Sequence, residues 1–337
     1  MNQANEYDAI VVGAGIAGLS AALYLSRQGL KTLVISKDLG GQLLMAGTIE
    51  NYPGIKVTSG AELAMAIEDQ VKTFGGEFRY GDVVNKIERL EDGRFMVSTE
   101  MGANYICEAV VLAFGKIPIR MGIEGEKEYD GRGVSYCSIC DGPLFKGKVT
   151  AVVGKGIQGL DAVLHMAELS PKIYYVTPTK LFGEEELIDA VKSLDNVVIM
   201  EYHRPVKVLG DGNKVTGLVV EDIKNRVEKE IQVEGIFVEL GYEAKTDFVS
   251  GLVELNEKNE IIINKVGETN VEGLFAAGDV TDIPYKQAVI SAGEAVKAAL
   301  SAFSYIQRRR GRKGAVLGDW RKTGKVKKEK PAFKLGL

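Results

Sequence analysis

Residues that bind metals or form disulfides are scarce in this chain of 337 residues, which has three cysteines and two histidines. Three cysteines cannot build the disulfide framework that stabilises small secreted proteins. A closed zinc site needs four ligands, and besides Cys137 and Cys140 only Cys107, His165 and His203 remain, none of them paired at ligand spacing. The sequence therefore predicts no metal site, and the Cys-x-x-Cys pair is interpreted as a redox centre.

Long apolar runs are also missing, since no stretch approaches the ~20 residues that a membrane-spanning helix needs. The first residues, MNQANEYD, lack the basic region and apolar core of a signal peptide. Hydrophobic residues make up 45% of the chain and charged residues 26%, as in soluble globular proteins, and the length suits two domains. We therefore expect a cytoplasmic protein with no membrane partner.

Charge is unevenly distributed along the chain, although the net charge is only −4. Residues 308–337 hold 12 of the 42 lysines and arginines but 2 of the 46 acids, so the remainder carries 30 basic against 44 acidic residues. This basic C-terminal tail is either a solvated segment folded over an acidic body or a docking surface for an acidic partner such as a ferredoxin. Nucleic acid is a third reading, but nothing else in the chain supports it.

Two strand–loop–helix units carry the Gly-x-Gly-x-x-Gly pattern that binds dinucleotides. A strand at residues 7–12 precedes the first loop and a helix is expected at 19–27; the second loop has a strand at 148–153 and a helix at 160–169. The glycines permit a tight turn and the close approach of a pyrophosphate, which the free N–H groups of the helix N-terminus attract. The expected loop residues are Gly13, Ala14, Gly15, Ile16, Ala17 and Gly18 in the first unit, and Gly154, Gly156, Ile157, Gln158 and Gly159 in the second.

The order of the segments predicts a three-layer α/β fold of two Rossmann-like dinucleotide-binding domains, the second inserted into the first. A strand at 271–277 ending in Gly278-Asp279 and a long helix at 287–305 supply the closing elements that the first domain lacks. The two fingerprints lie 141 residues apart, which indicates a duplicated fold rather than a short repeat. The expected domains are residues 1–117 with 246–306, residues 118–245 with the Cys-x-x-Cys pair, and the tail at 307–337.

The Cys-x-x-Cys pair is followed directly by Asp141 and Gly142, and several other short motifs accompany it. With these motifs the chain resembles the low-molecular-weight thioredoxin reductases, within the FAD-dependent pyridine nucleotide–disulfide oxidoreductases, over about residues 5–305. The motifs are Gly13–Gly18, Gly41-Gln42-Leu43, Glu50-Asn51-Tyr52-Pro53-Gly54, Ala113-Phe114-Gly115, Cys137–Gly142, Gly278-Asp279-Val280 and Gln287-Ala288.

The resemblance implies that the first domain binds FAD and forms a homodimer. Asp279 would bind the ribityl chain, Gln287 and Ala288 would lie against the flavin ring, and Gln42 and Asn51 would border it. The second strand ends at Ser36-Lys37-Asp38, where the usual ribose-binding acid is displaced or missing, which says little against FAD. Besides the loop Gly13–Gly18, the expected FAD residues are Ser36, Lys37, Gly41, Gln42, Leu43, Asn51, Val84, Ala113, Phe114, Gly115, Gly278, Asp279, Lys286, Gln287 and Ala288.

The resemblance also implies how the cysteines work, by thiol–disulfide exchange through thiolates. Cys140 would accept electrons from the flavin, and Cys137 would attack the disulfide of thioredoxin or of a glutaredoxin-like protein. Asp141 would protonate the departing thiolate, although without the resemblance it reads as a turn residue. The second domain would rotate about linkers at Lys116–Pro118 and Glu243–Lys245, so that the dithiol faces the flavin in one orientation and the partner in the other.

The second fingerprint is expected to bind NADPH, but the two arginines with which this family holds the 2′-phosphate are missing. Thr177-Pro178-Thr179 stands in their place, and only Lys180 is close. Losing two charge-assisted contacts of about 1.5–3 kcal/mol each weakens NADPH binding roughly 10²- to 10⁴-fold. A carboxylate that would favour NADH is missing there as well. The expected NADPH residues are Gly154, Gly156, Ile157, Gln158, Gly159, Lys180 and Gly241.

Four functions remain open at this point. The first is a thioredoxin-disulfide reductase that passes electrons from NADPH through FAD to Cys137 and Cys140. The second is the same enzyme with ferredoxin as the donor, and the third is a flavin-dependent dithiol oxidase that forms hydrogen peroxide from oxygen. The fourth is a binding protein with a basic tail and a residual flavin, which the intact Cys-x-x-Cys-Asp-Gly motif argues against.

Overall fold

The computed structural model describes residues 5–45 and 48–312, which form two compact units. The first unit comprises Ala61–Gly115 and the described parts of Met1–Leu43 and Thr246–Leu337. The second comprises Lys116–Lys245 and the described part of Leu44–Gly60. The segment Leu44–Gly60 thus groups with the second unit, whereas the sequence-based boundaries place it in the first domain. Residues 313–337, most of the basic tail, lie outside the described residues.

The first unit is built on a mostly parallel sheet. Its elements are β1 (Asn5–Val12), α1 (Ile16–Arg27), β2 (Thr32–Ser36), η1 (Gly41–Met45), α2 (Gly60–Thr73), β3 (Glu77–Tyr80), β4 (Val84–Arg89), β5 (Phe95–Thr99), β6 (Asn104–Leu112), η3 (Asp247–Val249), β17 (Leu274–Ala276) and α6 (Ala288–Arg309). The strand order is β3-β2-β1-β6-β5-β4, and β17 pairs in parallel with the end of β6. Strands β4, β5 and β6 form an antiparallel meander.

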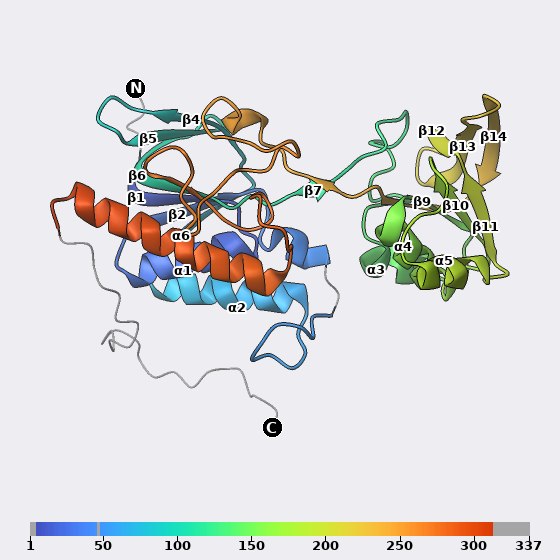
Figure 1. The fold of residues 1–337 in the computed structure, drawn as a ribbon, viewed down its shortest axis with the longest axis horizontal. Helices are drawn as coiled ribbons and strands as arrows, with labels where there is room; N and C mark the ends of the chain where they lie inside the picture. The colour runs from blue at the N-terminus through green and yellow to red at the C-terminus, as the bar shows by residue number, and fades with distance from the viewer. Residues whose placement is uncertain (1–4, 46–47, 313–337) are drawn as a thin grey trace. The chain divides into compact units, whose positions relative to one another are not determined.

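The apolar strands at the centre of this sheet are buried on both faces. Residues Ala9–Val12 and Ala109–Leu112 are at most 4% exposed, as expected for parallel strands covered on two sides. Helices α1, α2 and α6 lie together on one side of the sheet (Figure 1). The glycine loop follows β1 at the carboxyl edge of this sheet, so the fold places it where parallel α/β sheets bind their ligands.

The second unit has a five-stranded parallel sheet with the order β11-β10-β9-β15-β8 and a three-stranded antiparallel sheet with the order β12-β13-β14. Its elements are β7 (Ile117–Pro118), β8 (Val134–Ser135), α3 (Ser138–Asp141), η2 (Gly142–Phe145), β9 (Thr150–Gly154), α4 (Gly156–Ala167), β10 (Ile173–Thr177), α5 (Glu185–Lys192), β11 (Val197–Glu201), β12 (His203–Gly210), β13 (Val215–Asp222), β14 (Val227–Gln232), β15 (Gly235–Glu239) and β16 (Tyr242–Glu243).

Alternation along the strands produces two cores in this unit, one on each face of the parallel sheet. Val152 and Phe237 pack with buried residues of α4 and α5. Their neighbours Ala151, Val153 and Ile236 pack against the antiparallel sheet β12–β14. Because successive side chains of a strand point to opposite faces, the wholly apolar run of β9 is the signature of this three-layer arrangement. The predicted three-layer α/β class is confirmed.

The two segments predicted as linkers pair with each other. Strands β7 and β16 are antiparallel, with Ile117 opposite Glu243 and Pro118 opposite Tyr242. The chain therefore enters and leaves the second unit through a two-stranded ribbon, rather than through two independent loops.

Helix α6 continues beyond its predicted end at Tyr305 and includes the first arginines of the basic tail. Arg310 forms ion pairs with Asp8 and Glu108, and its Nε donates to Glu108 Oε1 at 2.8 Å. Arg309 lies 3.7 Å from the same glutamate. The described start of the tail is thus bound to acidic groups of its own unit, which agrees with the reading of a segment folded over an acidic body.

Candidate redox site and dinucleotide loops

Cys137 and Cys140 are joined by a disulfide at the N-terminus of the short helix α3. Cys137 caps this helix, because its Sγ accepts a hydrogen bond from the Cys140 amide at 3.1 Å. Both cysteines are half-buried, while Ile139 between them is 61% exposed. The dithiol is therefore anchored on one side and open on the other, as exchange with a partner disulfide requires.

Asp141, the last residue of α3, is held by a serine that the sequence does not single out. The buried Ser135 at the end of β8 donates from Oγ to Asp141 Oδ2 at 2.6 Å. The same oxygen accepts the Cys137 amide at 3.1 Å and lies 3.3 Å from the Cys137 carbonyl oxygen. One hydroxyl thus connects the acid and the first cysteine of the motif.

Glu239 is a second residue that sequence reasoning missed. It ends β15, and its Oε1 accepts the Ser138 amide at 3.3 Å. Burial raises the pKa of this carboxyl group, although its hydrogen bonds with Ser138 oppose the rise. The only available signal was an acid at the end of the otherwise apolar strand GIFVE, which places a carboxyl group at the carboxyl edge of the parallel sheet.

The second glycine loop is packed so tightly that side chains cannot replace its glycines. A Cβ on Gly154 would lie 2.9 Å from the Gly159 Cα, and a Cβ on Gly159 would lie 2.5 Å from the Tyr175 hydroxyl. Burial raises the pKa of Tyr175 to about 12. Gly156 has a φ of +61° and would bring a Cβ within 3.1 Å of the Phe182 ring. The loop exposes backbone at the N-terminus of α4, which suits a pyrophosphate.

The segment after β10 contains the positions where the arginines were expected. Thr177 is 1% exposed and belongs to the core, whereas Thr179 and Lys180 are exposed. The Leu181 amide donates to Glu201 Oε1 at 2.9 Å, so a carboxylate from β11 shapes this loop. Gly241, the remaining predicted residue, has a φ of +104°, and a Cβ there would lie 3.7 Å from Gln158 Oε1. The second unit therefore brings Gly241 to the glycine loop.

The first glycine loop is equally tight. A Cβ on Gly13 would lie 2.6 Å from the Ala113 carbonyl oxygen, and a Cβ on Gly18 only 1.9 Å from the Gly13 carbonyl oxygen. Gly15 forms a bridge with Gly40, which extends the cradle to the Gly41-Gln42-Leu43 motif. The displaced acid has a role here, because Asp38 Oδ1 accepts the Gly41 amide at 3.1 Å. The motifs around residues 13–18, 38–43 and 113–115 thus meet in one place.

Asp279 lies beside the same loop. Its neighbour Gly278 approaches Ala17 so closely that a Cβ there would lie 2.7 Å from the Ala17 Cβ. The carboxylate of Asp279 accepts from Ser291 at 2.9 Å, and Lys286 donates to the Asp279 carbonyl oxygen at 3.2 Å. Gln287 is the N-cap of α6 and Ala288 its first residue. These backbone cradles and the polar edge fit a dinucleotide with hydroxyl-bearing chains.

Three of the predicted FAD residues lie farther along the chain's edges, and one belongs to the other unit. Ser36 ends β2 and Lys37 follows it, where its carbonyl oxygen accepts the Gly81 amide at 3.2 Å. Val84 begins β4, three residues beyond Gly81. Asn51 lies in Leu44–Gly60, which groups with the second unit, so its predicted place beside the flavin stays a prediction.

Neither a metal cluster nor a membrane helix is found in the part of the chain that the structure describes. No three His, Cys, Asp or Glu side chains of residues 5–45 and 48–312 gather where they could hold a metal ion. Cys107 is 1% exposed in β6, and burial raises the pKa of its thiol. Among the helices described, none combines the length and the apolarity that crossing a bilayer demands.

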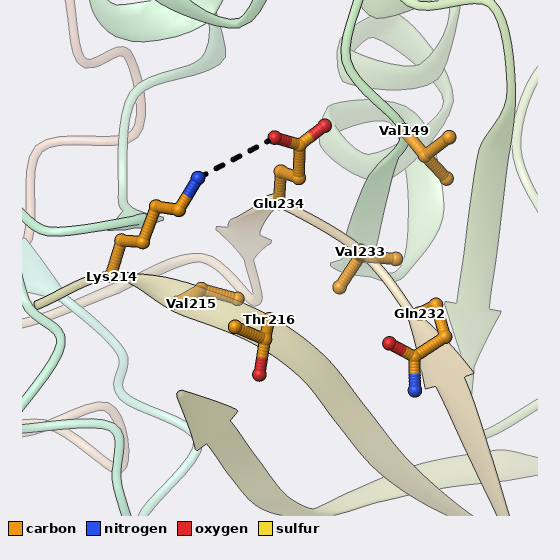
Figure 2. A pocket seen from close by; sticks show the side chains of 7 residues that line it. All are labelled: Val149, Lys214, Val215, Thr216, Gln232, Val233 and Glu234. Carbon is orange, nitrogen blue, oxygen red and sulfur yellow. Dashed lines mark ion pairs between the residues drawn. The ribbon is translucent and has the colours of Figure 1, made fainter. Parts of the chain in front are cut away.

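A hollow of about 230 Å³ lies in the second unit beside β13 and β14. Figure 2 shows Lys214 and Glu234 pointing toward one another at its edge, with Nζ and Oε1 3.9 Å apart. Its lining residues come from elements other than α3 and the glycine loop, namely Val149, Lys214, Val215, Thr216, Gln232, Val233 and Glu234. It contributes no group to the redox site.

The geometry of a disulfide beside a dinucleotide loop agrees with the comparisons. A family described as "Pyridine nucleotide-disulphide oxidoreductase" matches residues 7–299. This chain belongs to that family. The oxidoreductase is 37% identical over 304 residues to thioredoxin reductase of Aquifex aeolicus, covering 89% of this chain and 93% of that protein. It is 40% identical over 312 residues to an alkyl hydroperoxide reductase component of Pseudomonas putida, covering 91% and 60%, and so spans less than two thirds of that relative.

Solved structures extend the likeness of the oxidoreductase. Thioredoxin reductase of Lactococcus lactis matches with a TM-score of 0.76 and 30% identity, over 90% of this chain and 99% of that one. A ferredoxin-flavin thioredoxin reductase of Clostridium acetobutylicum matches with a TM-score of 0.51 and 31% identity, over 91% and 100%. The predicted resemblance is confirmed: the protein is a disulfide oxidoreductase and flavoprotein with the thioredoxin reductase fold, in a family that uses FAD with NAD(P)H.

Proposed function

We propose that this oxidoreductase reduces the disulfide of a thioredoxin-type protein through FAD and the Cys137–Cys140 pair. The observation that supports this most strongly is the capped, half-open disulfide followed directly by Asp141. A purely structural disulfide would be expected to be closed on all sides. The same pair linked to an acid by Ser135 is suited to repeated opening and closing.

In this proposal the first unit holds FAD and the second holds the pyridine nucleotide. The pyrophosphate of FAD would lie against Gly13–Gly18, and Asp279 would accept hydrogen bonds from hydroxyl groups of its chain. Gln42, Gln287 and Ala288 would border the ring. When bound, FAD supplies two electrons to the disulfide, which opens to a dithiol.

The exchange with the partner then balances without another reactant. The Cys137 thiolate attacks one sulfur of the partner disulfide, which forms a mixed disulfide and releases one partner thiolate. Cys140 attacks the Cys137 sulfur, which restores the Cys137–Cys140 bond and releases the second partner thiolate. Asp141 donates a proton to a departing thiolate within the enzyme and recovers it from water.

The electron donor is the part of the proposal with two candidates. The second glycine loop supports a pyridine nucleotide, but Thr177 is buried and Thr179 carries no charge, so little holds a 2′-phosphate. Ferredoxin is the alternative, which is supported by the likeness to the ferredoxin-flavin enzyme of Clostridium acetobutylicum. The described start of the basic tail does not favour it, because Arg309 and Arg310 are bound to acids of their own unit.

The deciding experiment is anaerobic reduction of the bound flavin, followed by absorbance, with NADPH, NADH and reduced ferredoxin in parallel. Rapid bleaching by micromolar NADPH supports an ordinary thioredoxin reductase. Bleaching by ferredoxin alone supports the alternative, in which the second unit serves to carry the dithiol. A flavin that an added dithiol cannot reduce would overturn the proposal, and hydrogen peroxide formed at the rate of dithiol loss would indicate the oxidase instead.

A further inference from the structure

Ser135 is the residue whose contacts exceed a structural role. It is 5% exposed and ends β8, which pairs with β15 so that Ser135 lies opposite Phe237. The parallel sheet therefore fixes its backbone, and its hydroxyl reaches the redox motif without any flexible segment. We propose that Ser135 is a positioning residue, which keeps the Asp141 side chain in place in both of its protonation states by reversing the hydrogen bond between them. This inference rests on the proposed role of Asp141 as the acid.

The hydrogen-bond capacity of a hydroxyl carries the argument. A serine has one hydrogen to donate and two lone pairs that accept. Ser135 Oγ lies near three groups: Asp141 Oδ2 at 2.6 Å, the Cys137 amide at 3.1 Å and the Cys137 carbonyl oxygen at 3.3 Å. The amide can only donate, so it takes one lone pair at all times. The single hydrogen can go either to Asp141 or to the Cys137 carbonyl oxygen.

These two choices match the two states of the acid. When Asp141 is ionised, the hydroxyl donates to it, and 2.6 Å is the length typical of a bond to a carboxylate. When Asp141 carries its proton, the carboxyl group donates to the second lone pair of Ser135. The serine hydrogen then rotates to the Cys137 carbonyl oxygen. Every polar group stays paired in both states, and the heavy atoms need not move.

The consequence concerns the step in which the disulfide opens. Two electrons break the Cys137–Cys140 bond and leave two thiolates. Asp141 gives its proton to one of them and becomes a carboxylate, which the Ser135 hydroxyl then stabilises. Without Ser135 the carboxyl group has no partner that follows its change of state, so it samples other rotamers. Displacement of a catalytic group by about 1 Å can cost on the order of 10²-fold in rate.

The test measures disulfide opening without relying on the flavin. Holoenzyme is mixed with dithiothreitol and quenched with acid, and the free thiols are alkylated and counted by mass spectrometry. In this reaction dithiothreitol takes the place of the electron donor, because its thiolate attacks one sulfur of the pair and the other leaves as a thiolate. Ser135→Ala is expected to slow opening at pH 7 roughly 10- to 100-fold. Ser170→Ala is the matched control, since Ser170 is a 3% exposed serine of the same unit whose hydroxyl bonds to Thr150 at 2.9 Å.

A double-mutant cycle separates positioning from a general loss of stability. In an Asp141→Asn background, Ser135→Ala is expected to change the rate less than about twofold, because no proton remains to be followed. Equal slowing in both backgrounds would mean that Ser135 acts through the fold, and would overturn the inference. An unchanged rate in Ser135→Ala, with slowing in Asp141→Asn, would overturn it while leaving the acid intact. An unchanged rate in Asp141→Asn alone would refute the acid role itself, and this inference with it.

Discussion

The carboxyl group of Glu239 accepts a hydrogen bond from the Ser138 amide at 3.3 Å, at the first residue of the dithiol helix. The backbone carbonyl of the same residue accepts the Lys155 amide at 3.4 Å, inside the second glycine loop. Glu239 therefore contacts both the expected nucleotide loop and the redox helix. A change at either place alters the surroundings of one buried carboxyl group.

Two substitutions of Glu239 should separate its hydrogen bond from its charge. Glu239→Gln retains an oxygen that accepts the Ser138 amide, whereas Glu239→Ala leaves that amide without its acceptor. An unmet buried amide costs about 1–3 kcal/mol, so the alanine variant should unfold at lower denaturant concentration at every pH. A glutamine variant that is destabilised as much as the alanine variant would contradict this account.

The pH dependence of the same pair follows from the raised pKa of Glu239. Burial favours the neutral acid in the folded protein, relative to the ordinary pKa of 4.5 for a glutamate. The stability contributed by the neutral form is fully present below about pH 4.5 and is lost as the pH rises through the folded-state pKa. Denaturant unfolding at pH 4 and pH 8 should therefore show the Gln variant gaining on the wild type at the higher pH. A constant difference would mean that the carboxyl group is not desolvated.

Gly18 offers a test of the first loop as a flavin site. A Cβ at this position would lie 1.9 Å from the Gly13 carbonyl oxygen, and backbone cannot yield as a side chain can. Gly18→Ala should cost at least the 1–3 kcal/mol typical of overpacking, with loss of bound flavin absorbance and a lower melting temperature. Gly293→Ala is the control, because a Cβ there meets nothing within 4 Å on α6. It should be neutral or stabilising by about 0.5–1 kcal/mol, and flavin retained by both variants would refute the assignment.

The regular elements could be predicted because their patterns are local. The expected helix at 59–74 appears as Gly60–Thr73, and the expected strand at 7–12 as Asn5–Val12. Both follow from the spacing of apolar residues and from glycines at the ends. The dinucleotide loops were found for the same reason, since strand, glycines and helix are contiguous.

The supports of the redox motif could not be predicted, because they depend on sheet pairing. Ser135 reaches Asp141 from a two-residue strand whose partner, β15, lies about 100 residues later in the chain. Glu239 reaches Ser138 across the same pairing. Helix α3 is too short for an apolar period, and a cysteine caps it rather than the usual serine or aspartate. Sequence patterns therefore identified the chemistry but not the residues that hold it.

Tyr175 explains why the third glycine of the second loop is required. Its buried hydroxyl lies 2.5 Å from the place of a Cβ on Gly159, so Gly159→Ala should destabilise the protein by about 1–3 kcal/mol. Removing the hydroxyl in Gly159→Ala/Tyr175→Phe should recover part of this loss, since the ring carbon is farther, at 3.2 Å. Thermal unfolding of both single variants and the double variant measures the coupling. Strict additivity would show that the Gly154 backbone, 3.0 Å away, causes the strain instead.

Thr179 is the position at which NADPH binding should be recoverable. Thr177 is buried in β10 and cannot present a guanidinium group to solvent, whereas Thr179 is exposed beside Lys180. A new charge-assisted contact contributes about 1.5–3 kcal/mol, so Thr179→Arg should tighten NADPH roughly 10- to 150-fold and leave NADH nearly unchanged. Direct titration of the holoenzyme with each nucleotide, by calorimetry, gives both dissociation constants.

The control for this gain of binding is Thr179→Gln, which supplies a long polar side chain without the charge and should leave both constants as they are. Equal tightening of NADPH and NADH in Thr179→Arg would indicate attraction to the pyrophosphate rather than to the 2′-phosphate. Failure to tighten either nucleotide would mean that the adenosine end lies elsewhere, and would favour a donor that does not use the second glycine loop.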